Sequence, residues 1–333
     1  MSSGGGILRI NLDEFNSGSK PAIEKITRDL THPFSLSDNS IFGIYEDRFN
    51  DIWIGTFSGG VNYYSYRNKK FMHVSEGINS LLKNNIVNAI LEDNRFLWIG
   101  TEGGLERYDK LTAQTKIFSY DAEDPVSIAS NPVDSLFKDH RGNLWVGTWT
   151  GGLSLYNSRS ETFKRYTPDV KPGSLSSENV FAIFEDSGNE LWIGTVSGGL
   201  NLFDYKSETF TTYKHDPKDP GSLYSDIIHD IKETADGRLL VAAYGSIDIF
   251  DRSLKKFTHY PMSSLFPDSL TSRYVVTIFI DSKKRIWLGT NDGLILFNEK
   301  LKMESEFANM SIDNILSSKN IISEKTVKTI IGK

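Results

Sequence analysis

The stretch Asn143-Leu144-Trp145-Val146-Gly147-Thr148 contains a Trp-x-Gly-Thr quartet that returns at nearly constant intervals along the chain. The intact copies begin at Trp53, Trp98, Trp145, Trp192 and Trp287. A worn copy is expected at Val241-Ala242-Ala243-Tyr244, so that successive copies lie 45 to 49 residues apart. A chain of 333 residues holds nearly seven units of this length, which disfavours two unrelated domains.

An aliphatic marker shows that the repeat extends beyond the quartet. It lies eight residues before an apolar position in every copy. The markers are Leu36, Leu82, Ile128, Leu175, Leu223 and Leu270, and the apolar positions are Ile44, Ile90, Leu136, Ile183, Ile231 and Ile278. Six equal spacings define a repeat with a fixed internal plan.

Residues 171–213 show the plan of one unit. Turn residues lead to strand-forming residues at 180–184, and a hairpin turn at 185–189 precedes a second strand at 191–195. Two more strands, at 200–203 and 209–213, complete the unit. Four short antiparallel strands in such a period are typical of a β-propeller blade. We therefore predict an all-β propeller with six complete blades, at about 32–76, 77–122, 123–168, 169–216, 217–263 and 264–307.

Glycine has a fixed place in the predicted blade. Glycine weakens a strand unless something packs closely over it, so the quartet glycine is predicted to leave clearance for a side chain of the adjacent blade. Glycine pairs are expected to permit the turn into the third strand. The pairs lie at 59–60, 103–104, 151–152 and 198–199.

The two ends of the chain carry patterns that resemble parts of a seventh blade. In the leading segment 1–31, residues 7–12 resemble a third strand and residues 23–28 a fourth. In the closing segment 308–333, a connection precedes a first-strand pattern at 326–331. We assign all segments to one propeller domain with a partial seventh blade, and expect a piece of a longer protein.

Composition excludes several classes of function. Lys and Arg number 37 against 43 Asp and Glu, a net charge of −6, so nucleic-acid binding is not expected. The absence of cysteine removes disulfides, thiol nucleophiles and Cys-ligated zinc. No apolar stretch is long enough to span a bilayer, and residues 1–12 show no secretion leader. No cofactor and no metal site are predicted.

The phrase Asp139-His140-Arg141-Gly142-Asn143-Leu144-Trp145-Val146-Gly147-Thr148, followed by Gly151-Gly152-Leu153, resembles the two-component regulator propeller repeat. Residues 94–105 resemble it as well, and the match covers almost the whole chain. The resemblance implies the periplasmic, non-catalytic sensor region of a bacterial hybrid two-component system. In that family, two seven-bladed propellers and an immunoglobulin-like domain precede a membrane helix, a histidine kinase and a response regulator. Members typically sense oligosaccharides, and contact with the membrane belongs to modules absent from this chain.

Catalytic motifs are not evident in the sequence. The histidines are scattered singly, and no GxSxG elbow or phosphate-binding loop occurs. Acids such as Glu46-Asp47, Glu92-Asp93 and Glu185-Asp186 recur before a hairpin turn, so we interpret them as turn residues that bind their own backbone. The doublet His229-Asp230 departs from its repeat position, and it carries the alternative hypothesis of a propeller lyase resembling the streptogramin B lyases.

Two variable columns of the repeat are candidates for ligand or partner binding. The turn after each second strand and the connection between blades emerge on one face, because strands alternate in direction. The turn column is Phe57, Glu102, Trp149, Val196, Tyr244 and Asn291. The connection column is Asn39, Asn85, Asn131, Glu178, Asp226 and Arg273.

Exposed aromatic rings beside amides and carboxylates suit sugars, and the alternative is that Trp149, Phe57 and Tyr244 pack over neighbouring blades. The predicted ligand is an oligosaccharide, neutral or weakly acidic because the negative net charge disfavours strongly sulfated glycans. A third hypothesis is a pure interaction disc, which docks a second propeller or another copy of itself.

Overall fold

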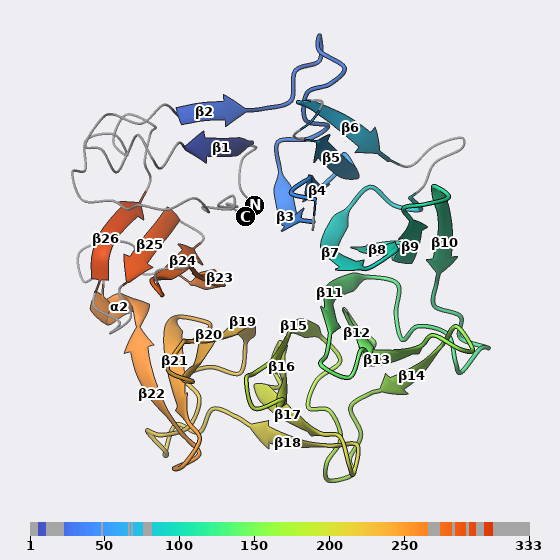
Figure 1. The fold of residues 1–333 in the computed structure, drawn as a ribbon. Coiled ribbons are helices and arrows are strands. Elements are labelled where there is room, and N and C mark those ends of the chain that lie inside the picture. The colour runs from blue at the N-terminus through green and yellow to red at the C-terminus, as the bar shows by residue number, and fades with distance from the viewer. Residues whose placement is uncertain are drawn as a thin grey trace.

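The structure is a computed structural model, and it describes residues 6–10, 23–47, 49–65, 67, 69–75, 82–265, 274–281, 284–290, 293–297 and 303–308. Figure 1 looks along the axis of a ring in which six four-stranded antiparallel sheets stand side by side, while a two-stranded hairpin occupies a further sector. In every sheet the strand order follows the chain, with the first strand nearest the axis and the fourth at the rim. The predicted propeller with six complete blades is confirmed.

The blades are numbered in chain order. Blade one holds β3 (Ile41–Glu46), β4 (Ile52–Thr56), β5 (Val61–Ser65) and β6 (Lys70–Val74), and blade two holds β7 (Val87–Asp93), β8 (Phe96–Thr101), β9 (Gly104–Asp109) and β10 (Gln114–Phe118). Blade three holds β11 (Val133–Lys138), β12 (Leu144–Thr148), β13 (Gly152–Asn157) and β14 (Thr162–Tyr166), and blade four holds β15 (Val180–Glu185), β16 (Leu191–Thr195), β17 (Leu200–Asp204) and β18 (Thr209–Tyr213). Blade five holds β19 (Ile228–Glu233), β20 (Leu239–Ala243), β21 (Ser246–Asp251) and β22 (Lys256–Pro261), followed by the short helix α2 (Met262–Leu265). Blade six holds β23 (Val275–Ile280), β24 (Ile286–Thr290), β25 (Gly293–Phe297) and β26 (Met303–Ala308).

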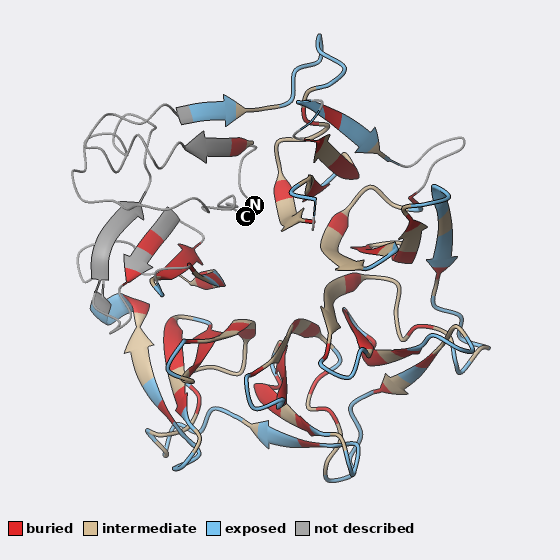
Figure 2. Ribbon diagram, in the orientation of Figure 1, coloured by how far each residue is buried: buried red, intermediate tan, exposed pale blue. Residues whose placement is uncertain are grey.

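The hydrophobic core lies between the blades. In one cluster, Trp145 and Leu153 of blade three meet Val180 and Leu191 of blade four. Figure 2 shows the buried residues concentrated in the second and third strands, and the second strands of blades three to six are buried along their whole length. Burial on both faces explains why these strands read as continuous apolar runs.

A buried aspartate at the first hairpin holds the quartet tryptophan. Asp139 Oδ1 accepts the backbone N–H groups of Arg141 and Asn143 at 3.0 and 2.8 Å, and its Oδ2 accepts the indole N–H of Trp145 at 2.8 Å. Equivalent indole contacts recur at Asp47, Asp186 and Asp281. The interpretation as turn residues is confirmed for Asp47 and Asp186, whose carboxylates accept backbone N–H groups of their own hairpin and also hold the tryptophan. It is wrong for three other acids: Glu92 accepts from Lys110, Asp93 accepts from Lys138 of blade three, and Glu185 accepts the His140 N–H of blade three.

The quartet glycine makes room for the first strand of the next blade. A Cβ atom placed on Gly194 would lie 2.6 Å from Cγ2 of Ile228, and one on Gly147 would lie 2.7 Å from Cγ1 of Val180. Real Cβ atoms do not approach other carbons this closely. The predicted clearance is therefore confirmed, and β-branched residues of the next blade fill it.

Gly194→Ala is expected to lower the free energy of unfolding by about 1–3 kcal/mol, because the added methyl group overpacks the interface with blade five. Gly43→Ala is the matched control, since a Cβ there would meet only the Asn88 carbonyl oxygen, at 3.7 Å. Urea unfolding followed by circular dichroism compares the two variants. Equal free energies of unfolding of the two variants would show that the interface accommodates the methyl group without cost.

The hairpin of β1 (Ile7–Ile10) and β2 (Ile23–Ile26) occupies the place of third and fourth strands in a seventh blade. The Gly6 N–H donates to the Asn39 carbonyl oxygen at 3.0 Å, as Gly152 donates to Glu178 and Gly199 to Asp226 between complete blades. Gly6 also has the positive φ, 75°, of those two glycines. The predicted leading part of a seventh blade is present, and the predicted first strand at 326–331 lies outside the described residues.

The worn quartet of blade five lies one residue earlier than predicted. Ala242 pairs with Asp230 in the register in which Gly194 pairs with Ala182, so the copy is Leu240-Val241-Ala242-Ala243. The error arose because the tryptophan that marks the register is absent, and buried Leu240 takes its place. In this register Tyr244 directly follows the quartet, as Trp149 does in blade three.

Candidate functional site

The two predicted columns meet on one face of the propeller, which we call the turn face. The N–H of each described turn residue donates to the carbonyl oxygen of the residue that follows the connection column in the same blade. These pairs are Phe57 to Ser40 (2.9 Å), Glu102 to Ile86 (3.2 Å), Trp149 to Pro132 (2.9 Å), Val196 to Asn179 (3.0 Å) and Tyr244 to Ile227 (2.9 Å). The turns and connections are thus fastened to each other around the ring.

A bulge at the start of every first strand adds an inner ring of side chains near the axis. In all six blades the pairing of the first and second strands shifts register at the second residue. A bulge of this kind re-aims a side chain. The bulge residues are Phe42, Asn88, Asp134, Phe181, His229 and Val276.

Four rings from the two sets and the ring of Tyr274, which directly precedes β23, form a continuous series, which we call the aromatic arc. Trp149 stacks on Phe181 with ring centroids 5.5 Å apart, and Phe181 stacks on His229 at 6.0 Å. His229 stacks on Tyr274 at 5.5 Å, and Tyr274 stacks on Tyr244 at 5.2 Å. All four interplanar angles lie between 24° and 26°. The arc therefore extends over blades three to six, and each ring is only slightly tilted against the next.

The ends of the arc reach solvent. Trp149 keeps 38% of its surface exposed and Tyr244 keeps 46%, although both pack on a ring of the neighbouring blade. Phe57, 42% exposed, packs edge-on against Phe42 of its own blade. These aromatic side chains both pack over neighbours and remain open to a ligand.

Polar groups complete the ring beside the arc. The side-chain amide of Asn88 donates to Glu102 Oε1 at 3.0 Å and lies 3.3 Å from Asp134 Oδ1 in the next blade. Two carboxylates and one amide thus lie between the phenyl rings of blade one and Trp149 of blade three. Hydroxyl groups of a sugar are natural partners for such acceptors and donors.

The described residues of the connection column accept hydrogen bonds from backbone N–H groups. Asn39, Asn131 and Asp226 accept the N–H of the residue eleven positions earlier, at 2.6–2.7 Å. The carbonyl oxygens of Asn85 and Glu178 accept the N–H of a glycine in the preceding blade. These residues hold the turn face in shape, and Val196 contributes its backbone to the same network. Asn291 and Arg273 lie outside the described residues.

A column of buried polar residues in the third strands was missed by the sequence reasoning. Each member accepts the backbone N–H of the residue after the aliphatic marker, at 2.7–3.2 Å. The members are Asn62, Glu106, Ser154, Asn201 and Asp248, all with 0% exposure. The signal in the sequence is a polar residue that recurs directly after a buried aliphatic one.

Glu106 is the member of this column whose ionisation is most affected by its surroundings. Burial raises the pKa of Glu106 to about 7, against opposing hydrogen bonds from the backbone of Lys83 and Asn84 and from the Thr101 hydroxyl. Its Oε2 atom has no hydrogen-bond partner in the described structure.

The two residues of the lyase hypothesis, His229 and Asp230, have different contacts. His229 lies in the middle of the aromatic arc, whereas Asp230 Oδ2 accepts the N–H of Ile278 at 2.8 Å and the hydroxyl of Thr277 at 3.1 Å in blade six. Asp230 Oδ1 accepts from Lys232 Nζ at 2.7 Å. Within the described ranges, no group of three or more His, Asp or Glu side chains is placed to hold a metal ion.

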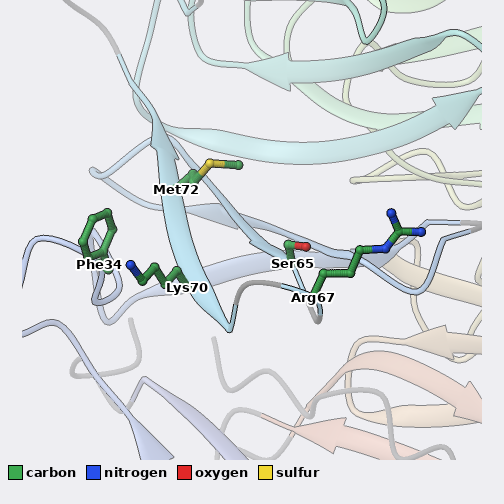
Figure 3. Close-up of a pocket in the computed structure, with 5 residues that line it drawn as sticks. All are labelled: Phe34, Ser65, Arg67, Lys70 and Met72. Atoms are coloured by element: carbon green, nitrogen blue, oxygen red, sulfur yellow. The ribbon is translucent and has the colours of Figure 1, made fainter.

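A separate depression lies at the outer edge of blade one. Figure 3 shows its lining, which is Phe34, Ser65, Arg67, Lys70 and Met72, and the Lys70 ammonium lies 4.6 Å from the centre of the Phe34 ring. None of these residues belongs to the turn or connection column.

In the part of the chain that the structure describes, no helix has the length and apolar character to cross a membrane.

The family described as two component regulator propeller matches residues 35–58, 127–150, 174–197 and 269–292. Histidine kinase P4 of Formosa agariphila is 27% identical over 94 residues, which are 26% of this chain and 7% of that protein. The chain thus spans a small part of this curated relative.

Two solved structures are similar in fold. The extracellular domain of a putative hybrid two component system from B. thetaiotaomicron superposes with a TM-score of 0.70 and 21% identity, covering 89% of this chain and 38% of that one. PorZ, a surface component of the type-IX secretion system of Porphyromonas gingivalis, superposes with a TM-score of 0.62 and 14% identity, covering 91% of this chain and 46% of that one. The four family matches each contain a tryptophan quartet on which a blade is built, so this chain carries the repeat of the two component regulator propeller family.

Proposed function

We propose that this propeller is the extracytoplasmic sensor portion of a hybrid two-component regulator, and that its turn face recognises an oligosaccharide. The observation that carries the proposal is the aromatic arc, both of whose ends are exposed. Its Trp149 end belongs to the same blade as Asp134, which lies next to Asn88 and Glu102 of blade two. The family and the extracellular domain with the same fold support the sensor role and a periplasmic location. No catalytic step is assigned to this chain.

The ring ends suit the apolar face of a pyranose, while the carboxylates and the amide suit its hydroxyl groups. Acidic residues recur in the turns, connections and first strands around the ring, at Asp38, Glu102, Asp134, Glu178 and Asp226. Lys83, a basic residue of the connection that precedes blade two, donates to Ser119 Oγ at 2.8 Å. A neutral oligosaccharide is therefore the preferred ligand, because a sulfated one would meet like charge.

Binding would transmit a signal by a change in packing. A ligand shifts an equilibrium between two arrangements only through its different affinity for them. A ligand on the turn face would favour one arrangement of this disc against a second propeller or a second copy of the chain. Such a change could then pass to modules beyond this chain.

The double substitution Trp149→Ala/Tyr244→Ala is expected to weaken oligosaccharide binding about tenfold or more, because each stacked ring contributes about 0.5–1.5 kcal/mol beyond its buried area. A panel of neutral oligosaccharides, screened by thermal shift and then by calorimetry, provides the measurement, since a specific ligand raises the apparent stability. Tyr120→Ala is the control, an exposed tyrosine outside the arc.

Unchanged affinity in a double variant that melts like the wild type would remove the turn face as the binding surface. If instead the disc docks a second copy, the panel is silent and the same double variant lowers self-association in analytical ultracentrifugation. The two readouts therefore separate the sensor proposal from a pure interaction disc.

A further inference from the structure

The turn that carries Trp149 contains a backbone conformation that β-branched residues rarely adopt. Thr150, the next residue, has a φ of 67°, in the left-handed region. Glycine tolerates this region, whereas the branched Cβ of threonine crowds the backbone there. Such a conformation persists only when its surroundings hold it in place, and it is concentrated at functional sites.

The surroundings that hold Thr150 belong partly to the next blade. The Thr150 N–H donates to Asn179 Oδ1 at 2.9 Å, and the Thr150 hydroxyl lies 3.2 Å from Ser130 Oγ. Asn179 precedes β15 of blade four, where its carbonyl oxygen accepts the N–H of Val196 at 3.0 Å. Its own N–H donates to Ser177 Oγ at 3.3 Å. Asn179 is thus fixed in blade four while its side chain reaches back to blade three.

This cross-blade contact is specific to blade three. In blade one the equivalent turn N–H, of Ser58, donates to Asp38 of the same blade at 2.8 Å. The other blades have no amide side chain at the position of Asn179. Their residues there are Ser40, Ile86, Pro132, Ile227 and Tyr274. The blade that carries the exposed tryptophan is therefore the one whose turn is tied to its neighbour by an asparagine.

We propose that Asn179 is the positioning residue for Trp149. Its Oδ1 atom fixes the Thr150 N–H next to the tryptophan, and this sets the indole against Phe181 with part of its surface open to solvent. Blades three and four thereby share one platform. The importance of this platform for an oligosaccharide rests on the proposed function, whereas the positioning itself does not.

Tryptophan fluorescence tests the proposal without any ligand. Trp149 is 38% exposed, and the other five tryptophans are at most 7% exposed, so acrylamide quenching reports mainly on Trp149. In Asn179→Leu the quenching constant of the exposed component should rise about twofold, because release of a ring that is now more than half covered roughly doubles its accessible surface. Asn179→Asp keeps the acceptor oxygen and should restore the wild-type value. Trp149→Phe identifies the exposed component.

Asn157→Leu is the matched control, because Asn157 is an asparagine of blade three whose Oδ1 accepts the Arg159 N–H at 3.0 Å, in the hairpin between β13 and β14. It should change the melting temperature and leave the quenching of Trp149 as it is. Unchanged quenching in Asn179→Leu, or equal quenching in the Asp and Leu variants, would overturn the proposal. If Asn179→Leu does not fold, Asn179→Ala and Asn179→Asp are compared instead, and equal quenching in these two again overturns it.

Discussion

Trp145→Ala is expected to lower the free energy of unfolding by about 3–5 kcal/mol, among the largest effects of any single substitution in this chain. The Trp145 side chain is completely buried between blades three and four. Its ring lies 5.0 Å from that of Phe203 and 5.8 Å from that of Tyr166, measured between centroids. Alanine would leave a cavity at this interface that rigid sheets on both sides cannot close. Urea unfolding followed by circular dichroism gives the free energy.

Replacement by phenylalanine separates the hydrogen bond of the indole from its volume. Burial would raise the pKa of Asp139, and hydrogen bonds from Trp145 and Asn143 outweigh this effect, so that the pKa is lowered. Trp145→Phe removes one of these donors. Trp98→Phe is the matched control, because the Trp98 indole N–H is buried without an acceptor in the described structure. Trp145→Phe should therefore cost more, by about 1–3 kcal/mol, and equal costs would show that the aspartate contributes nothing.

The fold could be predicted because its determinants are local and recur. Asp139 and Trp145, which the first hairpin of the blade joins, lie six positions apart, and the aliphatic marker and the quartet repeat at nearly fixed distances. The one error of register fell in blade five, where Leu240 replaces the tryptophan. Without the indole the pattern Leu-Leu-Val-Ala-Ala has no feature that distinguishes one residue from the next.

The candidate site was predictable in position and not in its contacts. The turn column was found because its residues vary within a constant frame, and Trp149 and Tyr244 do lie on one face. The arc itself depends on Phe181 and Tyr274, which contact these residues only across a blade interface. The bulge that aims Phe181 toward Trp149 leaves no mark in the sequence. Single-sequence patterns describe one blade at a time, and the site is built between blades.

The buried carboxyl of Glu106 makes the second large prediction, a gain of stability in Glu106→Gln at alkaline pH. Burial is the main cause that raises the pKa of Glu106 to about 7, from an ordinary value of 4.5. The folded state thus binds the proton more tightly than the unfolded state. Stability from this group is complete below pH 4.5 and is lost as the pH rises through 7.

The size of the effect follows from the two pKa values. A difference of one unit between the pKa values of the folded and unfolded states corresponds to about 1.4 kcal/mol. The free energy of unfolding of the wild type should therefore fall by roughly 3 kcal/mol at pH 8 and by less than about 1 kcal/mol at pH 5. In the wild type the Lys83 N–H donates to Glu106 Oε1 at 2.7 Å. Glutamine keeps an oxygen that accepts this N–H, and its side chain carries no charge. Glu106→Gln should therefore exceed the wild type in stability by about 3 kcal/mol at pH 8 and match it closely at pH 5.

The neutral residues of the same column make this expectation specific. Asn62, Ser154 and Asn201 accept the corresponding N–H in their own blades without an ionisable group. Ser154→Ala therefore serves as the control, since it removes an acceptor of the column and should change stability equally at both pH values. Urea unfolding of the three proteins at pH 5 and pH 8 provides the comparison. A Glu106→Gln difference that is the same at both pH values would mean that the carboxyl keeps its ordinary ionisation despite complete burial.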